Sequence, residues 1–193
     1  MAELVAETAR LRLRDWDSDD EAAFYGIMNT PAVMEHLGGV QTREQWSAAF
    51  TRISGFTRDF GHTFWIVEDK ASGEMQGFCG LKRVNAPGAG DLTGTPEIGW
   101  RLRTSAWGRG IAKEAAIASL DLGFGKFGYD RIIAMTIPPN SGSSGLMERL
   151  GMRRREDLDF TDERFGREVN PQIVYELTAA DWPAARERAL RPR

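Results

Sequence analysis

The chain has 193 residues with 25 basic and 28 acidic side chains, a formal net charge of −3 and a single cysteine. This length suits one domain, or one domain with an appendage, and the shares of hydrophobic (41%) and charged (27%) residues exclude a wholly disordered chain. The balanced charge argues against a dedicated nucleic-acid-binding protein, and two histidines beside one cysteine argue against a zinc site with the usual ligands.

The N-terminal segment, MAELVAETARLRLRDWD, carries acidic residues throughout and lacks the basic start and apolar run of a signal peptide. No uninterrupted apolar stretch is long enough to span a bilayer. Cys79 has no second cysteine with which to form an internal disulfide, which fits a reducing compartment. We therefore expect a cytoplasmic protein that binds neither nucleic acid nor a membrane.

In chain order, the first expected elements are a strand and three helices. Residues 9–14 alternate apolar and basic side chains, which is the period of a half-buried strand. Capping boxes or an N-terminal proline then mark three helix starts: Ser18 with Glu21, Pro31 (a short piece closed by Gly38 and Gly39), and Thr42 with Gln45.

From residue 62 onward the pattern changes to strands separated by turns and helices. The expected elements are strands at 62–69 and 75–84 joined by a hairpin turn, a mobile loop at 85–94, a strand at 95–103, a helix at 111–128, a strand at 131–137, a helix at 144–150, two strands between 152 and 178, and a polar helical tail at 179–193 without a core face. This order predicts an α/β (α+β) fold with a mixed, mostly antiparallel sheet. We expect one domain over residues 1–193, with its core at 9–178.

The segment WGRGIA, residues 107–112, connects an expected strand to an expected helix. Gly108 and Gly110 allow positive φ and close approach of a ligand to the backbone. The first amides of a helix have no intrahelical partner and the helix dipole is positive there, so this turn suits a phosphate or pyrophosphate. Arg109 and Lys113 can add positive charge at its rim, while the alternative is a tight turn that binds nothing.

A second glycine- and serine-rich segment, residues 140–145 (NSGSSG), follows the next strand. It could be a flexible linker. However, it lies between an apolar strand and the amphipathic segment LMERLGM, where a linker is not expected. The two segments together indicate a ligand-binding site more strongly than either segment alone.

With both segments in order, the sequence resembles the GCN5-related N-acetyltransferase (GNAT) superfamily, and within it the RimJ/RimL-like branch. WGRGIA is similar to the acetyl-CoA loop Q/R-x-x-G-x-G/A at Gly110 and Ala112, although Trp107 replaces the usual Gln or Arg. Asn140, Ser143 and LMERLGM resemble the family's Asn-x-x-Ser turn and the helix after it, and PEIGWRL resembles the central strand. The resemblance covers residues 9–178.

The resemblance implies a twisted sheet of about seven strands whose fourth and fifth strands splay apart to admit acetyl-CoA. The pyrophosphate would bind the amides of Gly108, Arg109, Gly110 and Ala112, with Ile111 and Lys113 in the same turn. The pantetheine would extend along residues 98–102, which include Ile98, Trp100 and Leu102, and Asn140 would contact the pantetheine or thioester region.

Acetyl transfer to an amine requires a neutral amine and a proton for the departing thiolate. Glu97 is the candidate base, acting through water; alternatively it is the polar position of an alternating strand or a partner of Arg101. Many relatives carry a tyrosine acid where this chain has Met147, which cannot donate a proton. Ser143 is then the candidate acid, and it could also be a helix cap.

Other candidates carry weaker expectations. His36 and His62 are expected at the surface or at a strand start, and Tyr175 in the core with its hydroxyl at an edge. The acidic run between Asp157 and Glu163 either attracts a cationic amine or is a solvated charged segment.

These residues predict an acetyl-CoA-dependent N-acetyltransferase that needs no metal and acts by direct attack of the amine in a ternary complex. Cys79 lies far from both motifs in the sequence, which disfavours an acetyl-cysteine intermediate. The acceptor is a protein N-terminus or a small amine, and the protein is a monomer or a homodimer. The alternative is a non-catalytic acyl-CoA-binding or sensing module on the same fold.

Overall fold

In the computed structural model, which describes residues 2–191, eight strands form one mixed sheet. Its strand order is β1-β2-β3-β4-β5-β6-β8-β7, and β5 with β6 is a parallel pair in an otherwise largely antiparallel arrangement. The strands are β1 (Leu4–Glu7), β2 (Leu11–Arg14), β3 (Phe64–Asp69), β4 (Met75–Arg83), β5 (Pro96–Leu102), β6 (Arg131–Thr136), β7 (Arg153–Arg154) and β8 (Ile173–Thr178). The expected fold class is therefore confirmed, with one strand more than the seven expected.

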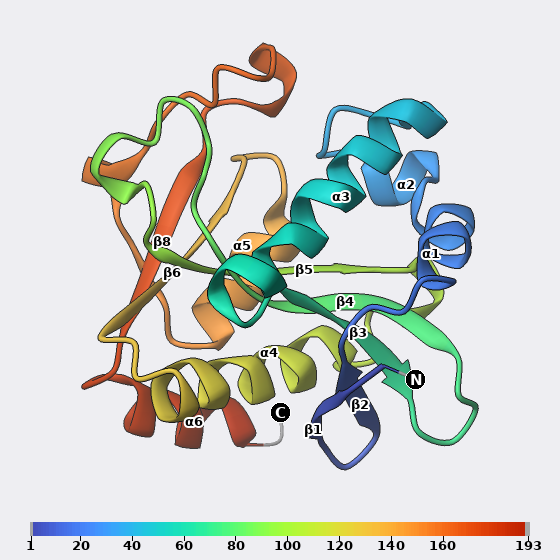
Figure 1. The fold of residues 1–193 in the computed structure, drawn as a ribbon. Helices are drawn as coiled ribbons and strands as arrows, with labels where there is room; N and C mark the ends of the chain where they lie inside the picture. The colour runs from blue at the N-terminus through green and yellow to red at the C-terminus, as the bar shows by residue number, and fades with distance from the viewer. Residues whose placement is uncertain (1, 192–193) are drawn as a thin grey trace. The chain divides into compact units, whose positions relative to one another are not determined.

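Six α-helices accompany the sheet (Figure 1). They are α1 (Asp20–Met28), α2 (Pro31–Met34), α3 (Arg43–Phe60), α4 (Ile111–Asp121), α5 (Ser141–Arg149) and α6 (Trp182–Leu190). Within residues 2–191, none of these helices has the length and hydropathy of a membrane span.

The chain divides into two compact units. The first unit runs up to Lys82 and includes Gly99–Ala118, and the second comprises Arg83–Ile98 and Ser119–Arg193. Strand β5 and helix α4 each contribute residues to both units. The expectation of a single domain stays a prediction.

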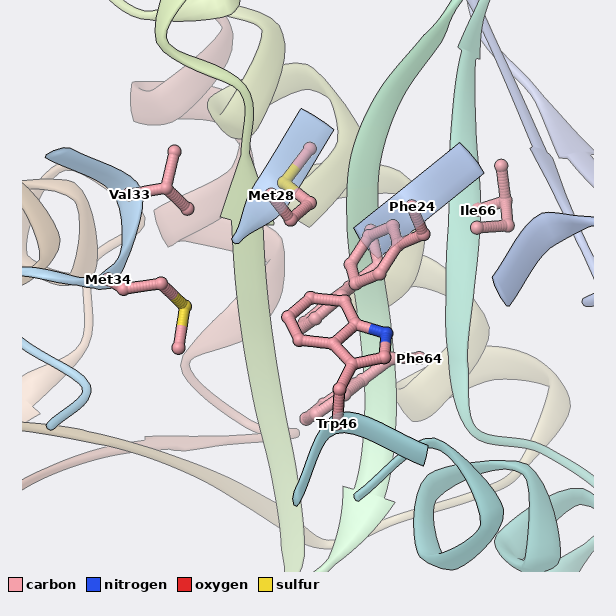
Figure 2. Close-up of a cluster of buried hydrophobic side chains, with 8 residues drawn as sticks. Phe24, Met28, Val33, Met34, Trp46, Phe64 and Ile66 are labelled. Carbon is pink, nitrogen blue, oxygen red and sulfur yellow. The ribbon is translucent and has the colours of Figure 1, made fainter. Parts of the chain in front are cut away.

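In the first unit, helices α1, α2 and α3 supply side chains to an aromatic-rich core on one face of β3 and β4 (Figure 2). The rings of Phe64 and Phe78 stack with centroids 4.6 Å apart, and Phe24 stacks on Phe78 at 5.7 Å. The cluster comprises Phe24, Met28, Val33, Met34, Trp46, Phe64, Ile66 and Phe78. Helix α3 begins at the expected capping box, because the Thr42 hydroxyl accepts from the Gln45 amide at 3.3 Å and the Gln45 side chain accepts from the Thr42 amide at 3.0 Å.

Glycine at position 77 lets β4 and β5 approach each other in the first unit. A Cβ at Gly77 would lie 2.1 Å from the Arg101 carbonyl oxygen, and Gly77 has φ of 139°. No side chain fits there without moving a backbone. This close contact helps to position the half of β5 that belongs to the first unit.

The second unit is centred on the antiparallel pair β6 and β8, which runs in register from Arg131 opposite Thr178 to Thr136 opposite Ile173. The expectation of a mobile loop at 85–94 is wrong, because this segment contributes Ala86, Ala89 and Leu92 to a buried cluster with β6 and β8. Its turn-forming residues fold into a 3₁₀ turn at Gly90–Leu92, and their small apolar neighbours fill the core.

Near the N-terminus one strand was not predicted and one expectation is wrong. The segment Leu4–Glu7, which has no clear strand period, forms β1 by pairing with β2. Helix α1 has no side-chain cap at its N-cap Asp19. Instead of the expected Ser18 box, the Asp20 carboxylate accepts from the Asp17 amide at 2.6 Å and pairs with Arg14 at 2.6 Å.

The C-terminal helix α6 has a core face, contrary to expectation. Trp182, Ala185 and Ala189 are buried, and the Trp182 indole donates to the Asp121 carboxylate at 3.0 Å. Arg186 pairs with the same carboxylate at 2.8 Å. The helix shows little periodicity because two of its buried positions are alanines.

We expect Trp182→Ala to lower the free energy of unfolding by about 3–5 kcal/mol, because it removes a buried ring and the partner of Asp121. Leu190→Ala on the same helix removes a side chain that is 54% exposed, and its cost should stay within about 0.5 kcal/mol. Urea denaturation of both variants measures the difference. Equal costs would show that α6 is not packed.

Candidate functional site

The glycine-rich turn before α4 has the backbone geometry of an anion-binding loop. Gly108 and Gly110 have φ of 72° and 75°, which other residues rarely adopt. No atom lies within 4 Å of a Cβ placed on Gly108, and the nearest atom at Gly110 is a guanidinium nitrogen of Arg10 at 3.6 Å. Space is therefore open beside both residues.

The first intrahelical hydrogen bond at this end of α4 runs from the Glu114 amide to the Gly110 carbonyl at 3.0 Å. The amides of Ile111 and Ala112 precede that bond, so the helix itself gives them no acceptor. With the positive end of the helix dipole, they can bind a phosphate oxygen. The turn therefore fits the pyrophosphate expected from the sequence.

The tip of the β1–β2 hairpin holds this turn in place. The Glu114 carboxylate accepts from the Thr8 hydroxyl at 2.5 Å, from the Arg10 amide at 2.9 Å and from Arg10 Nε at 2.7 Å. Arg10 Nη1 also donates to the Arg109 carbonyl at 3.0 Å. Arg10 thus fixes one carbonyl of the turn and the first turn of α4 together.

These contacts change the pKa of the Glu114 carboxyl. Burial raises its pKa, but hydrogen bonds from Thr8 and Arg10 lower it by more, so the pKa of Glu114 lies below its ordinary value of 4.5. The carboxylate is the form that stabilises the turn.

The residues from Trp107 to Gly110 are all exposed. Trp107 is 51% exposed, and its indole donates to the Leu102 carbonyl at 2.9 Å. Arg109 is exposed and donates to the Ser105 carbonyl at 3.4 Å, and Lys113 is half-buried. Trp107 therefore connects the end of β5 to the turn, in place of the Gln or Arg usual in the motif.

Along β5, the residues predicted to meet the pantetheine differ in exposure. Ile98 and Leu102 are 1% and 5% exposed, so their side chains belong to the core, whereas Trp100 is half-buried. Gly99 packs against the Phe64 ring, and a Cβ there would lie 2.8 Å from it. A ligand along β5 would therefore pair with the backbone of the strand, as an additional strand does.

In the second unit, the candidate base Glu97 lies on β5 opposite Ile133 of β6. Its side chain is 8% exposed, in a strand whose first residues are all buried. The charge of Glu97 contributes to a raised pKa of the Arg164 guanidinium, after the larger effect of Asp162. Glu97 is thus a buried carboxylate rather than a solvated position of an alternating strand.

Helix α5 begins at Ser141, three residues before the expected start at 144. The candidate acid Ser143 lies in its first turn. Asn140 is the N-cap, because its side-chain oxygen accepts from the Ser143 amide at 3.2 Å. The suggestion that Ser143 caps this helix is therefore wrong, since Asn140 has that role. Met147, at the position of the family's tyrosine, is 1% exposed and packs in the core.

The acidic run after β7 is largely paired with arginines, and part of it, including Asp157 and Glu163, is exposed to solvent. Asp157 pairs with Arg155 and Asp159 with Arg154. Asp162 is buried and pairs with Arg164 at 2.6 Å. Across residues 2–191, no three His, Cys, Asp or Glu side chains gather as metal ligands.

The two histidines have structural surroundings. His62 is buried directly before β3, and its Nδ1 lies 2.8 Å from the Leu81 carbonyl oxygen. His36 lies 4.0 Å from Glu35 and is partly exposed. Tyr175 is buried, and its hydroxyl donates to Glu148 at 3.4 Å.

Comparisons with known proteins show to which family the chain belongs. A family model described as an acetyltransferase (GNAT) domain matches residues 10–153. The chain is 33% identical over 146 residues to the uncharacterised protein YkkB of Bacillus subtilis, a match that covers 75% of this chain and 83% of YkkB. The chain therefore belongs to the GNAT family and is an acetyltransferase.

Solved structures agree with this assignment. An acetyltransferase from Agrobacterium tumefaciens superposes with a TM-score of 0.72 at 25% identity, covering 89% of this chain and 92% of that one. Mycobacterium smegmatis RimJ, solved in complex with CoA-disulfide, superposes with a TM-score of 0.66 at 22% identity, covering 92% and 87%. At that identity the likeness to RimJ shows the fold, which in RimJ holds a CoA molecule.

Sequence reasoning missed the residues that hold the turn. Thr8 and Arg10 precede Glu114 by about a hundred residues, and only pairing of β1 with β2 brings them to α4. Glu114 follows the glycine motif directly and looks like an ordinary acidic residue in a helical first turn. Co-variation of Arg10 with Glu114 among relatives would be the signal that finds such a pair.

We expect Glu114→Gln to lower the free energy of unfolding at neutral pH and to have less effect in acid. Because the folded pKa of Glu114 is depressed, its stabilisation is complete above the unfolded pKa and is lost as pH falls through the folded one. Denaturant unfolding from neutral pH to about pH 3 should show the two proteins converging. Glu3→Gln, at an exposed position, is the control, and a gap that stays constant with pH would contradict the assignment.

Proposed function

We propose that this acetyltransferase moves the acetyl group of acetyl-CoA to a primary amine by direct attack in a ternary complex. The observation that carries the proposal is the pair of left-handed glycines, Gly108 and Gly110, directly before the uncapped amides of α4. This turn lies inside the residues matched by the GNAT family model.

In this proposal, the pyrophosphate binds the amides of Gly108, Arg109, Gly110 and Ala112, in the turn completed by Ile111. The side chains of Arg109 and Lys113 add positive charge at its edge. The pantetheine pairs with the backbone of residues 98–102, and Asn140 contacts the pantetheine or the thioester. RimJ supports the choice of ligand, since its structure contains CoA in the same fold.

The reaction forms a C–N bond and breaks the C–S bond of the thioester. The amine must first lose a proton, and Glu97, which is buried on β5, is the proposed acceptor of that proton through a water molecule. The departing thiolate then takes up a proton, for which Ser143 is the candidate donor. Cys79 is completely buried on β4, which argues against an acetyl-cysteine intermediate.

The acceptor is a protein N-terminus or a small amine. The protein is placed in the RimJ/RimL-like branch, whose fold it shares, and is proposed to be cytoplasmic. A monomer or a homodimer would serve this function. The second candidate, a non-catalytic acyl-CoA sensor, is favoured by one observation: Met147 lies buried where relatives carry a tyrosine acid.

We expect Gly110→Glu to abolish acetyl-CoA binding measured by calorimetry, because it places a carboxylate where the pyrophosphate should lie. Gly61→Glu is a matched control: Gly61 has the same φ of 75°, no atom within 4 Å of its Cβ position, and a place at the far end of α3. The control shares the backbone strain without the phosphate site. Failure of the wild type to bind acetyl-CoA would overturn the proposal, as would equal losses in both variants.

We expect Glu97→Gln to lower kcat by about 10²–10⁴-fold with an acceptor amine and to leave acetyl-CoA affinity unchanged. A base also predicts recovery of rate at high pH, where the amine deprotonates unaided. Steady-state rates across pH and calorimetry together test this role. A wild type that binds acetyl-CoA but acetylates none of a broad amine panel would favour the sensor.

A further inference from the structure

Arg101 of β5 has an environment unlike that of an ordinary structural arginine. Its Nη1 lies 3.7 Å from the Met34 sulfur, a weak acceptor, and its guanidinium carbon lies 5.5 Å from the centre of the Phe78 ring. Its Nε is shielded from solvent and has no hydrogen-bond partner in the described chain. Burial lowers the pKa of this guanidinium to about 10, so it is still charged at neutral pH.

Arg14 provides the contrast within the same unit. Its side chain is 17% exposed, and two carboxylates, those of Asp20 and Glu68, lie 2.6 Å from its nitrogens. No carboxylate of the first unit pairs with Arg101. The surroundings of Arg101 are instead members of the apolar cluster, Met34 and Phe78.

Arg101 as a whole is half-buried, but its shielded Nε has no acceptor. A partly desolvated guanidinium without a counter-ion is costly, so such groups are usually paired or lie where a ligand pairs them. A hydrophobic side chain of similar length would pack against Met34 and Phe78 without this cost. Stability of the fold therefore does not explain why this position carries a charged side chain. Its planar donors match a carboxylate in size and geometry.

The position of Arg101 connects it to the acceptor. Alternation along β5 puts Arg101 on the same face of the strand as Gly99 and the proposed base Glu97. In the close-up of the cluster, Met34 lies on one side of the pale green β5 ribbon, and Phe24 and Phe64 lie on the other (Figure 2). The guanidinium of Arg101 contacts Met34 and faces the Phe78 ring, so it borders the cluster from β5.

We propose that Arg101 binds a carboxylate of the amine acceptor, so that the substrates are amines that also carry an anionic group. This inference rests on the proposed acetyltransferase function. It narrows the acceptor from any primary amine to amino acids or to peptides with an acidic residue near the N-terminus. Simple alkylamines and neutral peptides are then poor substrates.

The test compares acceptors that differ in one carboxylate. The first arm pairs ω-amino acids (β-alanine, 4-aminobutyrate, 6-aminohexanoate) with the n-alkylamines of equal length, and the second pairs Ala-Glu-Ala-amide with Ala-Gln-Ala-amide. We expect kcat/KM to favour the carboxylated member of at least one arm by about 10–100-fold, and Arg101→Met to erase that preference. The arm that responds distinguishes amino acids from peptides.

Three further measurements make the outcome decisive. Acetyl-CoA affinity should be equal in wild type and Arg101→Met, and the melting temperature of the variant should be unchanged or higher, since a desolvated charge is removed. Arg103→Met is the matched control, because Arg103 follows the same strand and pairs with Glu74 at 3.9 Å. Hexanoate should raise the melting temperature of the wild type more than hexanol does, and this difference should vanish in Arg101→Met.

The comparison of hexanoate with hexanol tests carboxylate binding by Arg101 even if no amine in the panel is acetylated. Acetyl-CoA binding with no preference for carboxylates in turnover or in melting would overturn this inference and leave the proposed function intact. Absence of acetyl-CoA binding by the wild type would instead overturn the proposed function. A large fall in the melting temperature of Arg101→Met would show that Arg101 is structural.

Discussion

The start of α4 is the constraint on which the proposed chemistry depends. A helix that begins without a side-chain cap leaves amides that need an acceptor, and in this chain two glycines with positive φ keep that end open. Glycine residues make the backbone of this turn flexible, so its shape needs support from side chains. Trp107 supplies part of that support from within the motif, and Arg10, held by Glu114 together with Thr8, supplies the rest from outside it.

Elements governed by local contacts were predictable from the sequence. The capping box of Thr42 and Gln45 formed as expected because its bonds join residues three apart. The box expected at Ser18 is absent, and Arg14 instead joins the Asp20 carboxylate of α1 to Glu68 of β3, a residue 54 positions after Arg14 in the chain. Strand β1 likewise exists because of its partner rather than its own pattern.

The same distinction between local contacts and contacts with other parts of the chain applies to the candidate site. The glycine turn and the Asn140 turn were visible as motifs, since each is a short segment whose residue types determine its conformation. The isolation of Arg101 was not visible, because alternation alone allows a pair with Glu97 and only the packing of Met34 and Phe78 shows what surrounds it. The neutralisation of the acidic run by neighbouring arginines also needed coordinates. Sequence reasoning thus identified the ligand class better than the acceptor class.

The attachment of the turn to the β1–β2 hairpin has a consequence for affinity. If the hairpin tip detaches in a fraction of molecules, the amides of the turn are arranged for an anion only in the remainder, and the observed dissociation constant rises in inverse proportion to that remainder. Residues 4–10 would then set how much of the population can accept the ligand. Extensions fused to the N-terminus, or its truncation, would change affinity through this equilibrium alone.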